Sequence, residues 1–159
     1  MKYTIVCIGK LKEPYLREGV AEFVKRTRPY GGIVIQELNE SKIGDKPSDA
    51  DRLQVVEEEG DRLLKAAPKN SYKVLLDVYG KPMSSEQLAE TISKLEVDGR
   101  SDMTFIIGGA FGVSENLRQA VDYKLSFSLM TFTHQMVRLL LVEQIYRACK
   151  INRHEPYHW

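Results

Sequence analysis

Short apolar runs alternate with longer stretches of mixed polar and apolar residues along the chain. Each short run is rich in β-branched or aromatic residues and has glycine or a polar residue close to its end. This composition is typical of a buried strand. The sequence therefore predicts five strands, at Tyr3–Gly9, Ile33–Leu38, Tyr72–Gly80, Met103–Gly109 and Tyr123–Ser128.

The stretches between these runs have the period of amphipathic helices. Pro14 fits the first turn of one helix. The segment 48–51 (SDAD) fits a capping box at the start of a second helix, which Pro68 ends. Ser84 or Ser85 can cap a third helix, and Ser114 a short fourth. The apolar positions at helical spacing are Leu53, Val56, Leu63 and Leu64 in the second helix, and Val137, Leu140, Leu141, Gln144, Ile145 and Ala148 in the last.

The alternation of strands and helices predicts one α/β domain over residues 1–159. We expect a mostly parallel sheet with helices on both faces. Ligands of such folds collect at the carboxyl ends of the strands. Three of these ends carry distinctive residues, at Leu76–Gly80, Ile107–Gly112 and Phe127–Phe132. The N-terminal half offers no comparable set, so we expect the site in the C-terminal half.

Composition narrows the class of protein without identifying it. The chain has 43% hydrophobic and 28% charged residues and a net charge of +1, which is ordinary for a globular protein. No segment approaches the ~20 apolar residues of a membrane span. Cys7 and Cys149 stand far apart in apolar stretches, so we expect buried free thiols and a cytoplasmic protein. No metal-ligand spacing occurs, and we expect no metal.

The distribution of charge and histidine is more informative than the total. All three histidines (His134, His154 and His158) lie in the last 26 residues, together with the only tryptophan, Trp159. The same region has a mild excess of basic residues, which suits an anionic partner such as RNA. A solvated helix face followed by a loose tail explains the charges equally well.

Two loops resemble parts of a nucleoside site. IIGGAFGV, residues 106–113, follows a predicted strand and precedes a capped helix. SFSLMTF, residues 126–132, is apolar and rich in hydroxyls. Neither loop contains lysine or arginine, which disfavours a di- or triphosphate and favours a ligand such as S-adenosylmethionine, whose sulfonium is positive. A tight turn and a buried strand end are the alternatives.

Four longer motifs carry a resemblance to a known family. LLDVYGKPMSSEQLA, FIIGGAFG, LSFSLMTFTHQMVRLLLVEQIYRA and NRHEPYH resemble the RlmH family, and the likeness extends over essentially the whole chain. That family consists of SPOUT-class methyltransferases that use S-adenosylmethionine to methylate N3 of a pseudouridine in 23S (large-subunit) rRNA on the assembled ribosome. The resemblance implies a homodimer and a C-terminal trefoil knot, with knot and cofactor site in about 72–159. It also implies cofactor contacts at Leu76, Gly108, Phe127, Ser128, Leu129, Met130, Thr131 and Phe132.

The reaction requires removal of the N3 proton, and cationic or aromatic side chains are needed to bind the base. His134 and His158 are the titratable candidates. Arg153 and Arg138 can stabilise negative charge or hold phosphates, and Tyr157 can stack on a splayed base. In the alternative interpretation His134 caps a helix, Glu143 pairs with Arg147, and the PYHW end is disordered without RNA.

Three positions depart from the pattern of the family. Thr133 stands where proline is common, His154 where glycine is common, and Trp159 where lysine is common. Two other functions stay open from the residues alone. One is a non-catalytic nucleoside- or ribosome-binding module. The other is a hydrolase that uses His134 with Ser126 or Ser128, although no GxSxG motif supports it.

Overall fold

A computed structural model describes all 159 residues and contains one parallel sheet of five strands. The strand order is β2-β1-β4-β3-β5, so the N-terminal strand lies inside the sheet. The predicted α/β fold with a parallel sheet is confirmed. The strands are β1 (Lys2–Ile8), β2 (Ile33–Leu38), β3 (Tyr72–Pro82), β4 (Asp102–Ile107) and β5 (Tyr123–Ser126).

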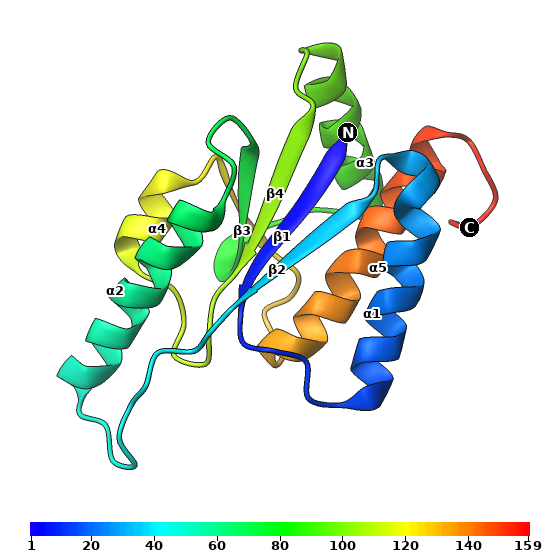
Figure 1. Cartoon of the computed structure of the whole chain (residues 1–159). Helices are drawn as coiled ribbons and strands as arrows, with labels where there is room; N and C mark the ends of the chain where they lie inside the picture. Colours follow the sequence, from blue (N-terminus) through cyan, green and yellow to red (C-terminus); the bar gives the residue numbers. More distant parts are fainter.

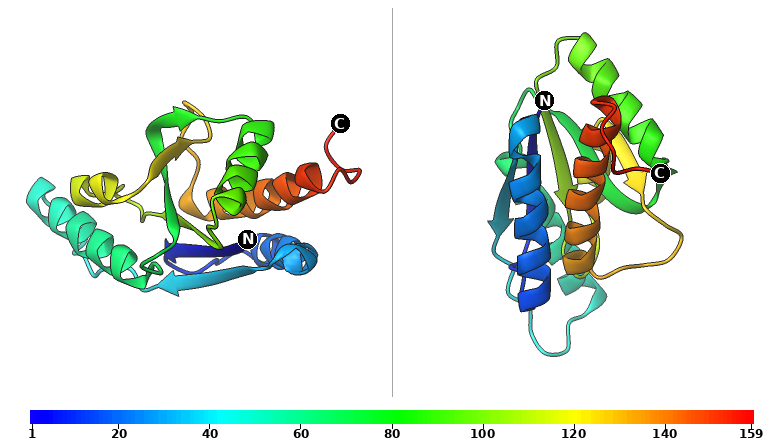
Figure 2. Two further views of the ribbon diagram at one scale, coloured as in Figure 1. Left: turned by 90° about the horizontal axis from the view of Figure 1, so that it is seen from above. Right: turned by 90° about the vertical axis from the view of Figure 1, so that its right-hand side faces the viewer.

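Helices cover both faces of this sheet, as Figures 1 and 2 show. On one face α5 packs between α1 and α3, and on the other α2 packs beside α4. The helices are α1 (Pro14–Thr27), α2 (Asp49–Ala66), α3 (Ser85–Val97), α4 (Glu115–Ala120) and α5 (His134–Asn152), and a 3₁₀ turn (Arg28–Tyr30) follows α1.

The alternation of side chains along each strand divides the core into two clusters. In β1, Ile5 and Cys7 face the larger cluster under α1, α3 and α5. Val6 and Ile8 face the smaller cluster under α2 and α4. Because both faces are covered, β1 is apolar almost throughout. Both cysteines are buried and free, as expected.

The predicted helix starts are confirmed in detail. Ser48 forms a capping box with Asp51, and Ser84 forms one with Gln87. Ser85 therefore does not cap α3, and its hydroxyl instead donates to Gln144 Oε1 at 2.6 Å, which ties α3 to α5. Ser114 caps α4. These serines satisfy backbone N–H groups that the first helical turn leaves without partners.

Two predicted apolar faces differ from the buried faces at single positions. In α2, Leu53 is 58% exposed, and Val55 is buried instead. In α5, Leu140 lies at the surface, and Arg138 is completely buried. Arg138 is buried because α5 contacts α1, α3 and the sheet. The buried surface of α5 is therefore wider than the predicted apolar stripe. The sequence period therefore located these helices and most of their buried positions correctly, among them Val56, Leu63, Leu141, Ile145 and Ala148.

The strands β3 and β5 also differ from their predicted bounds. β5 ends at Ser126 because the Ser126 hydroxyl turns back to donate to the carbonyl of Ser128 at 3.1 Å. β3 continues to Pro82, but its pairing with β5 shifts register between Leu76 and Lys81. This irregularity opens the sheet where three connecting loops meet.

Candidate functional site

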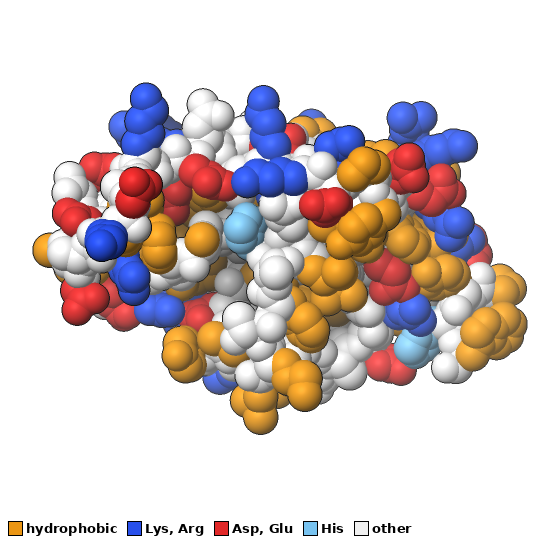
Figure 3. Space-filling model, turned by 90° about the horizontal axis from the view of Figure 1, so that it is seen from below, with side chains coloured by type: hydrophobic (Ala, Val, Ile, Leu, Met, Phe, Trp, Pro, Cys, Tyr) orange, Lys and Arg blue, Asp and Glu red, His pale blue; other side chains and the backbone are white.

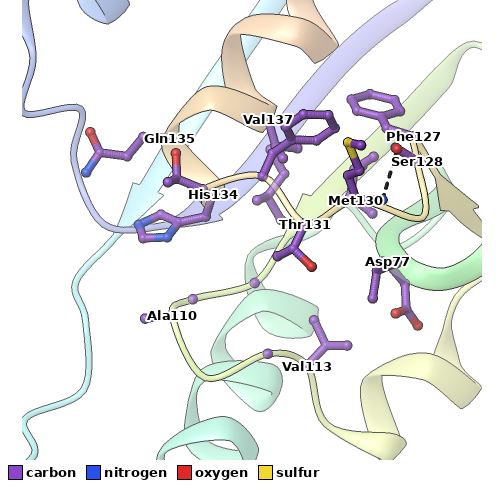
Figure 4. Close-up of a pocket in the computed structure, with 18 of the residues that line it drawn as sticks. Asp77, Ala110, Val113, Phe127, Ser128, Met130, Thr131, His134, Gln135 and Val137 are labelled. Carbon is purple, nitrogen blue, oxygen red and sulfur yellow. Dashed lines mark hydrogen bonds between the residues drawn. The ribbon is translucent and has the colours of Figure 1, made fainter.

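A cavity of about 800 Å³ lies at the carboxyl edge of the sheet and is lined by 25 residues, of which 13 are hydrophobic. A volume in this range suits a small ligand. Figure 3 views this face of the molecule, where charged side chains of both signs gather toward the periphery and uncharged atoms surround the hollow. Figure 4 shows side chains and loop backbone from several elements converging on it.

The end of β3 forms one wall of the cavity. Leu76 and Asp77 both line it, at the point where the strand loses its register with β5. Asp77 is buried and accepts a hydrogen bond from Arg118 Nε at 2.8 Å. Arg118 also lies over the ring of Tyr79, 5.9 Å from its centroid. The ion pair fixes the arginine and compensates its charge inside the cavity.

The glycine loop after β4 forms a second wall. Gly108, Gly109 and Gly112 all line the cavity. A Cβ at Gly108 would lie 2.6 Å from Val113 Cγ1 and 3.0 Å from the Gly112 carbonyl oxygen. Gly112 has φ +98, which non-glycine residues rarely adopt. The loop is thus folded so tightly that its backbone, not its side chains, faces the ligand space.

The hydroxyl-rich loop between β5 and α5 forms the third wall. Ser128 Oγ accepts a hydrogen bond from the Met130 N–H at 3.0 Å, which holds the loop in a turn (Figure 4). Leu129 is 96% exposed and does not line the cavity, unlike its neighbours. The residues of this loop that do line it are Phe127, Ser128, Met130, Thr131 and Phe132.

His134 is the first residue of α5 and lines the cavity where the third wall ends. The helix cap is Thr133, whose hydroxyl accepts from the Met136 N–H at 3.2 Å, so the His134 ring is free of that task. Burial, and then the nearby Arg138 charge, lower the pKa of His134 below its ordinary value of 6.5. The ring is therefore neutral near pH 7 and able to accept a proton.

A fourth wall comes from the N-terminal half, where sequence reasoning expected nothing. Lys12, Tyr15 and Leu16 line the cavity at the start of α1. The Lys12 N–H donates to Gln135 Oε1 at 3.1 Å, which fixes this segment beside the start of α5. The wall could have been predicted, because β1 also ends at the carboxyl edge of the sheet. Lys12 and Arg118 also place two cations at a cavity expected to have none.

Arg138 does not face the cavity as a free cation. Its guanidinium is fully buried and pairs with Glu37 Oε2 at 2.7 Å. It also donates to the Gly9 carbonyl oxygen at 3.1 Å. The suggestion that Arg138 binds phosphate or base is therefore wrong, because its side chain is inaccessible. It instead fastens α5 to the ends of β1 and β2.

The other three proposed catalytic residues lie far from the cavity in this chain. Arg153, Tyr157 and His158 follow the end of α5, and this 19-residue helix is about 28 Å long. Figure 1 shows α5 running from the carboxyl edge of the sheet to the opposite edge, where the chain ends. The protomer thus brings His134 to the cofactor-loop residues and leaves the tail at the other end.

The tail is folded along α5 and α3, contrary to the expectation of disorder. Tyr157 donates to Glu143 Oε1 at 2.9 Å, and Arg147 pairs with the same oxygen at 2.6 Å. His158 lies between Arg147 and Glu86, with Nδ1 3.1 Å from the former and Nε2 2.7 Å from the latter. The Glu143–Arg147 helix-face pair is as predicted. Trp159 is 97% exposed.

The backbone conformation at His154 explains why glycine is common at this position in the family. Its φ of +55 is in the left-handed region, which glycine adopts without strain. There its N–H donates to the Ile151 carbonyl oxygen at 3.0 Å and closes the end of α5. Thr133, the other departure near the site, replaces the fixed φ of proline with a side-chain cap.

Neither a metal centre nor a membrane span is found. No group of three or more histidine, cysteine or acidic side chains is arranged to hold a metal ion. None of the helices combines the length and apolarity that crossing a bilayer requires.

The fold and cavity match a known class of enzymes. A family model described as "Predicted SPOUT methyltransferase" matches residues 1–158, and the chain belongs to this family. Ribosomal RNA large subunit methyltransferase H from Halothermothrix orenii is 52% identical over 158 residues, which covers 99% of both chains. The protein of the same name from Carboxydothermus hydrogenoformans is 46% identical over 158 residues, with the same coverage.

Solved structures show the same fold at low sequence identity. The tRNA (m1G37) methyltransferase from Aquifex aeolicus superposes with a TM-score of 0.55 at 14% identity, covering 92% of this chain and 70% of that one. A putative methyltransferase from Legionella pneumophila, solved with bound cofactor SAM, gives a TM-score of 0.50 at 13% identity, over 93% of this chain and 66% of that one. These likenesses extend the fold assignment beyond the immediate relatives.

Proposed function

We propose that the protein transfers the methyl group of S-adenosylmethionine to N3 of a pseudouridine in 23S rRNA, and that its substrate is the assembled ribosome. The observation that carries this is the convergence of three walls and neutral His134 on one cavity. The full-length similarity to rRNA large subunit methyltransferases supports RNA as the substrate. A ribosomal substrate implies a cytoplasmic enzyme.

The residues of the cavity fit this cofactor. The walls of Leu76, Phe127 and Phe132 offer apolar surface for adenine, and the Gly108 backbone allows close approach. Asp77 compensates Arg118, so the cavity does not repel a sulfonium as two free cations would. When bound, S-adenosylmethionine supplies an electrophilic methyl group, and S-adenosylhomocysteine is left after transfer.

His134 has the properties of the proton acceptor. The N3 imide of pseudouridine loses its proton only well above neutral pH, so methylation needs a base or a group that stabilises the anion. His134 is half-buried, neutral near pH 7 and adjacent to the cofactor loop. It would accept the N3 proton as the nitrogen forms its bond to the methyl carbon.

A homodimer would complete the site. A second hollow of about 360 Å³ lies beside the cavity, between α3, α5 and the hydroxyl-rich loop, and its lining includes Met83, Phe132 and Leu140. Leu129 and Met130 are exposed next to it. A second copy could cover this apolar surface with its α5 antiparallel to α5 of the first copy. The tail of the second copy would then lie near the cavity of the first, which the first copy's own tail cannot reach. Arg153, Tyr157 and His158 would then act in trans, an arrangement that two-fold symmetry repeats in both sites.

The experiment is transfer of a radiolabelled methyl group to assembled ribosomes, isolated large subunits and protein-free rRNA, all lacking the modification. We expect label on ribosomes, and mass spectrometry of the digested RNA should place it on pseudouridine N3. The alternative, a non-catalytic nucleoside- or ribosome-binding module, predicts cofactor or ribosome binding without label on any of the three. Confirmed cofactor binding with no transfer would decide for that alternative.

A further inference from the structure

We infer that Tyr15 is the stacking platform for the target base once that base has left the RNA stack. The inference rests on the proposed function and concerns a residue outside the cofactor loops and the predicted catalytic residues. Tyr15 lines the cavity on the wall formed by the start of α1, yet its side chain is 61% exposed. The ring therefore stands at the cavity wall where a ligand can reach it.

The segment that carries Tyr15 is held rigidly. Pro14 fixes the first turn of α1. Arg17 Nη1 donates to the carbonyl oxygen of Lys12 at 2.9 Å, and the Lys12 N–H donates to Gln135 at 3.1 Å. In the body of the helix, Gly19 packs so closely on Leu139 of α5 that a Cβ would lie 2.9 Å from its Cδ1. The ring is therefore presented from a backbone that cannot easily withdraw it.

The position of this segment matches the chemistry. Figure 4 shows Gln135 next to His134 at the start of α5. Because the Lys12 N–H donates to Gln135, the wall that carries Tyr15 is fastened beside the proposed proton acceptor. N3 lies on the base-pairing edge of pseudouridine, and it becomes accessible only when the base is splayed out of its stack. A splayed base exposes both π faces, and an aromatic side chain at the cavity recovers part of the lost stacking.

The other aromatic side chains are less suited. The Tyr79 ring, on the opposite wall, already has Arg118 near its face. Phe132 is shared with the second hollow that we assign to the dimer. In this chain the Tyr157 ring packs edge-to-face against Tyr146 and lies under Arg147. Tyr15 has no such partner, since no aromatic or cationic group stacks on it.

The test compares Tyr15→Leu with Tyr15→Phe, using ribosomes that lack the modification. We expect Tyr15→Leu to lower kcat/KM for ribosomes roughly 10- to 100-fold, because leucine keeps an apolar side chain and loses the π face. Tyr15→Phe should stay near the wild-type value, since the ring is retained. S-adenosylmethionine affinity, Tm and sedimentation should be unchanged in both variants. Leu53→Ala, an exposed apolar residue on α2 away from the cavity, is the matched control.

Each other outcome overturns the inference in a recognisable way. Wild-type kinetics in Tyr15→Leu would show that the ring does not touch the base. Loss of cofactor affinity would place Tyr15 in the cofactor site, and a change in sedimentation would place it at a subunit contact. An inactive Tyr15→Phe would mean that the hydroxyl acts instead of the ring. Absence of methyl transfer by the wild-type protein itself would refute the proposed function, and the role of Tyr15 would be refuted with it.

Discussion

Arg138 and Glu37, 101 residues apart in the sequence, form an ion pair of 2.7 Å in which the arginine side chain is completely buried. The pair joins α5 to the end of β2, and a second bond from the arginine reaches Gly9 after β1. The start of α5, and with it His134, is thereby fixed relative to the carboxyl edge of the sheet. This clamp provides the first prediction.

Arg138→Ala should destabilise the fold by about 2–3 kcal/mol, because the carbonyl oxygen of Gly9 loses its partner and the partly exposed Glu37 carboxylate loses its counter-ion. Denaturant unfolding monitored by circular dichroism measures this. Lys94→Ala, which removes the exposed pair with Glu90, is the control and should leave the midpoint nearly unchanged. Equal stability of the two variants would show that the buried pair is not a clamp.

His134→Asn should lower the rate of methyl transfer by about 100-fold or more, with little change in cofactor affinity. The pH profile provides a sharper test. Because the pKa of His134 is lowered below 6.5, the ring is mostly neutral near pH 7, and its protonated fraction grows as the pH falls. Activity should therefore be lost on the acidic side, and in His134→Asn that acidic limb should vanish. An acidic limb that persists unchanged would assign the proton acceptor to another group.

His158→Ala should sharply lower methyl transfer while cofactor affinity stays near the wild-type value, since His158 lies outside the cavity of its own chain. Mixed dimers test the trans arrangement directly. A dimer of one His134→Asn and one His158→Ala subunit should retain one intact site if the tail acts in trans, and none if it acts in cis. His154→Asn, in the same tail but suited to the left-handed backbone, is the control and should remain active. Loss of cofactor binding in His158→Ala would place the tail in the cofactor site.

Gly108→Ala should weaken S-adenosylmethionine binding before it affects anything else. The added Cβ would lie 2.6 Å from Val113 Cγ1, so the glycine loop must shift away from its close fold. Isothermal titration calorimetry against Gly44→Ala measures the effect, because a Cβ at Gly44 meets nothing within 4 Å. Unimpaired binding by Gly108→Ala would refute our placement of the cofactor.

His154→Gly should stabilise the fold by about 1 kcal/mol. The residue stands at φ +55 at the end of α5, where a left-handed backbone costs a side chain roughly this much. Thermal unfolding of the variant should show a higher Tm than the wild type. A lower Tm would mean that the histidine side chain contributes more than the strain it bears.

Much of the fold could be predicted from sequence because each element carries local signals. Strands buried on both faces read as uninterrupted apolar runs, and serines capped three helices as expected. The burial of a charged side chain in α5 was not predictable in the same way. Burial of Arg138 depends on Glu37 and on backbone carbonyls that only the folded chain brings near, so a charged residue in a helix was read as exposed.

The candidate site also contains residues that local sequence signals predict and residues that only the folded chain brings together. Motifs led to the cofactor loops, and seven of the eight residues expected there line the cavity, while Leu129 points outward. The wall from Lys12 to Leu16 carries no residue that the sequence assigned to the site, and strand order brings it there. The tail residues are identifiable from sequence, but their distance from His134 is a matter of helix length and of partners, which no local pattern contains.

The interior position of β1 has a consequence for synthesis on the ribosome. Its register partners on one side run from Asp102 to Ile107, so the central pair of the sheet joins residues about a hundred positions apart. Sequence-distant pairing of this kind folds slowly. During synthesis, β1 is therefore apolar and lacks its partner β4 on one edge until most of the chain has left the exit tunnel. Nascent chains of this protein should need protection by chaperones until β4 has emerged.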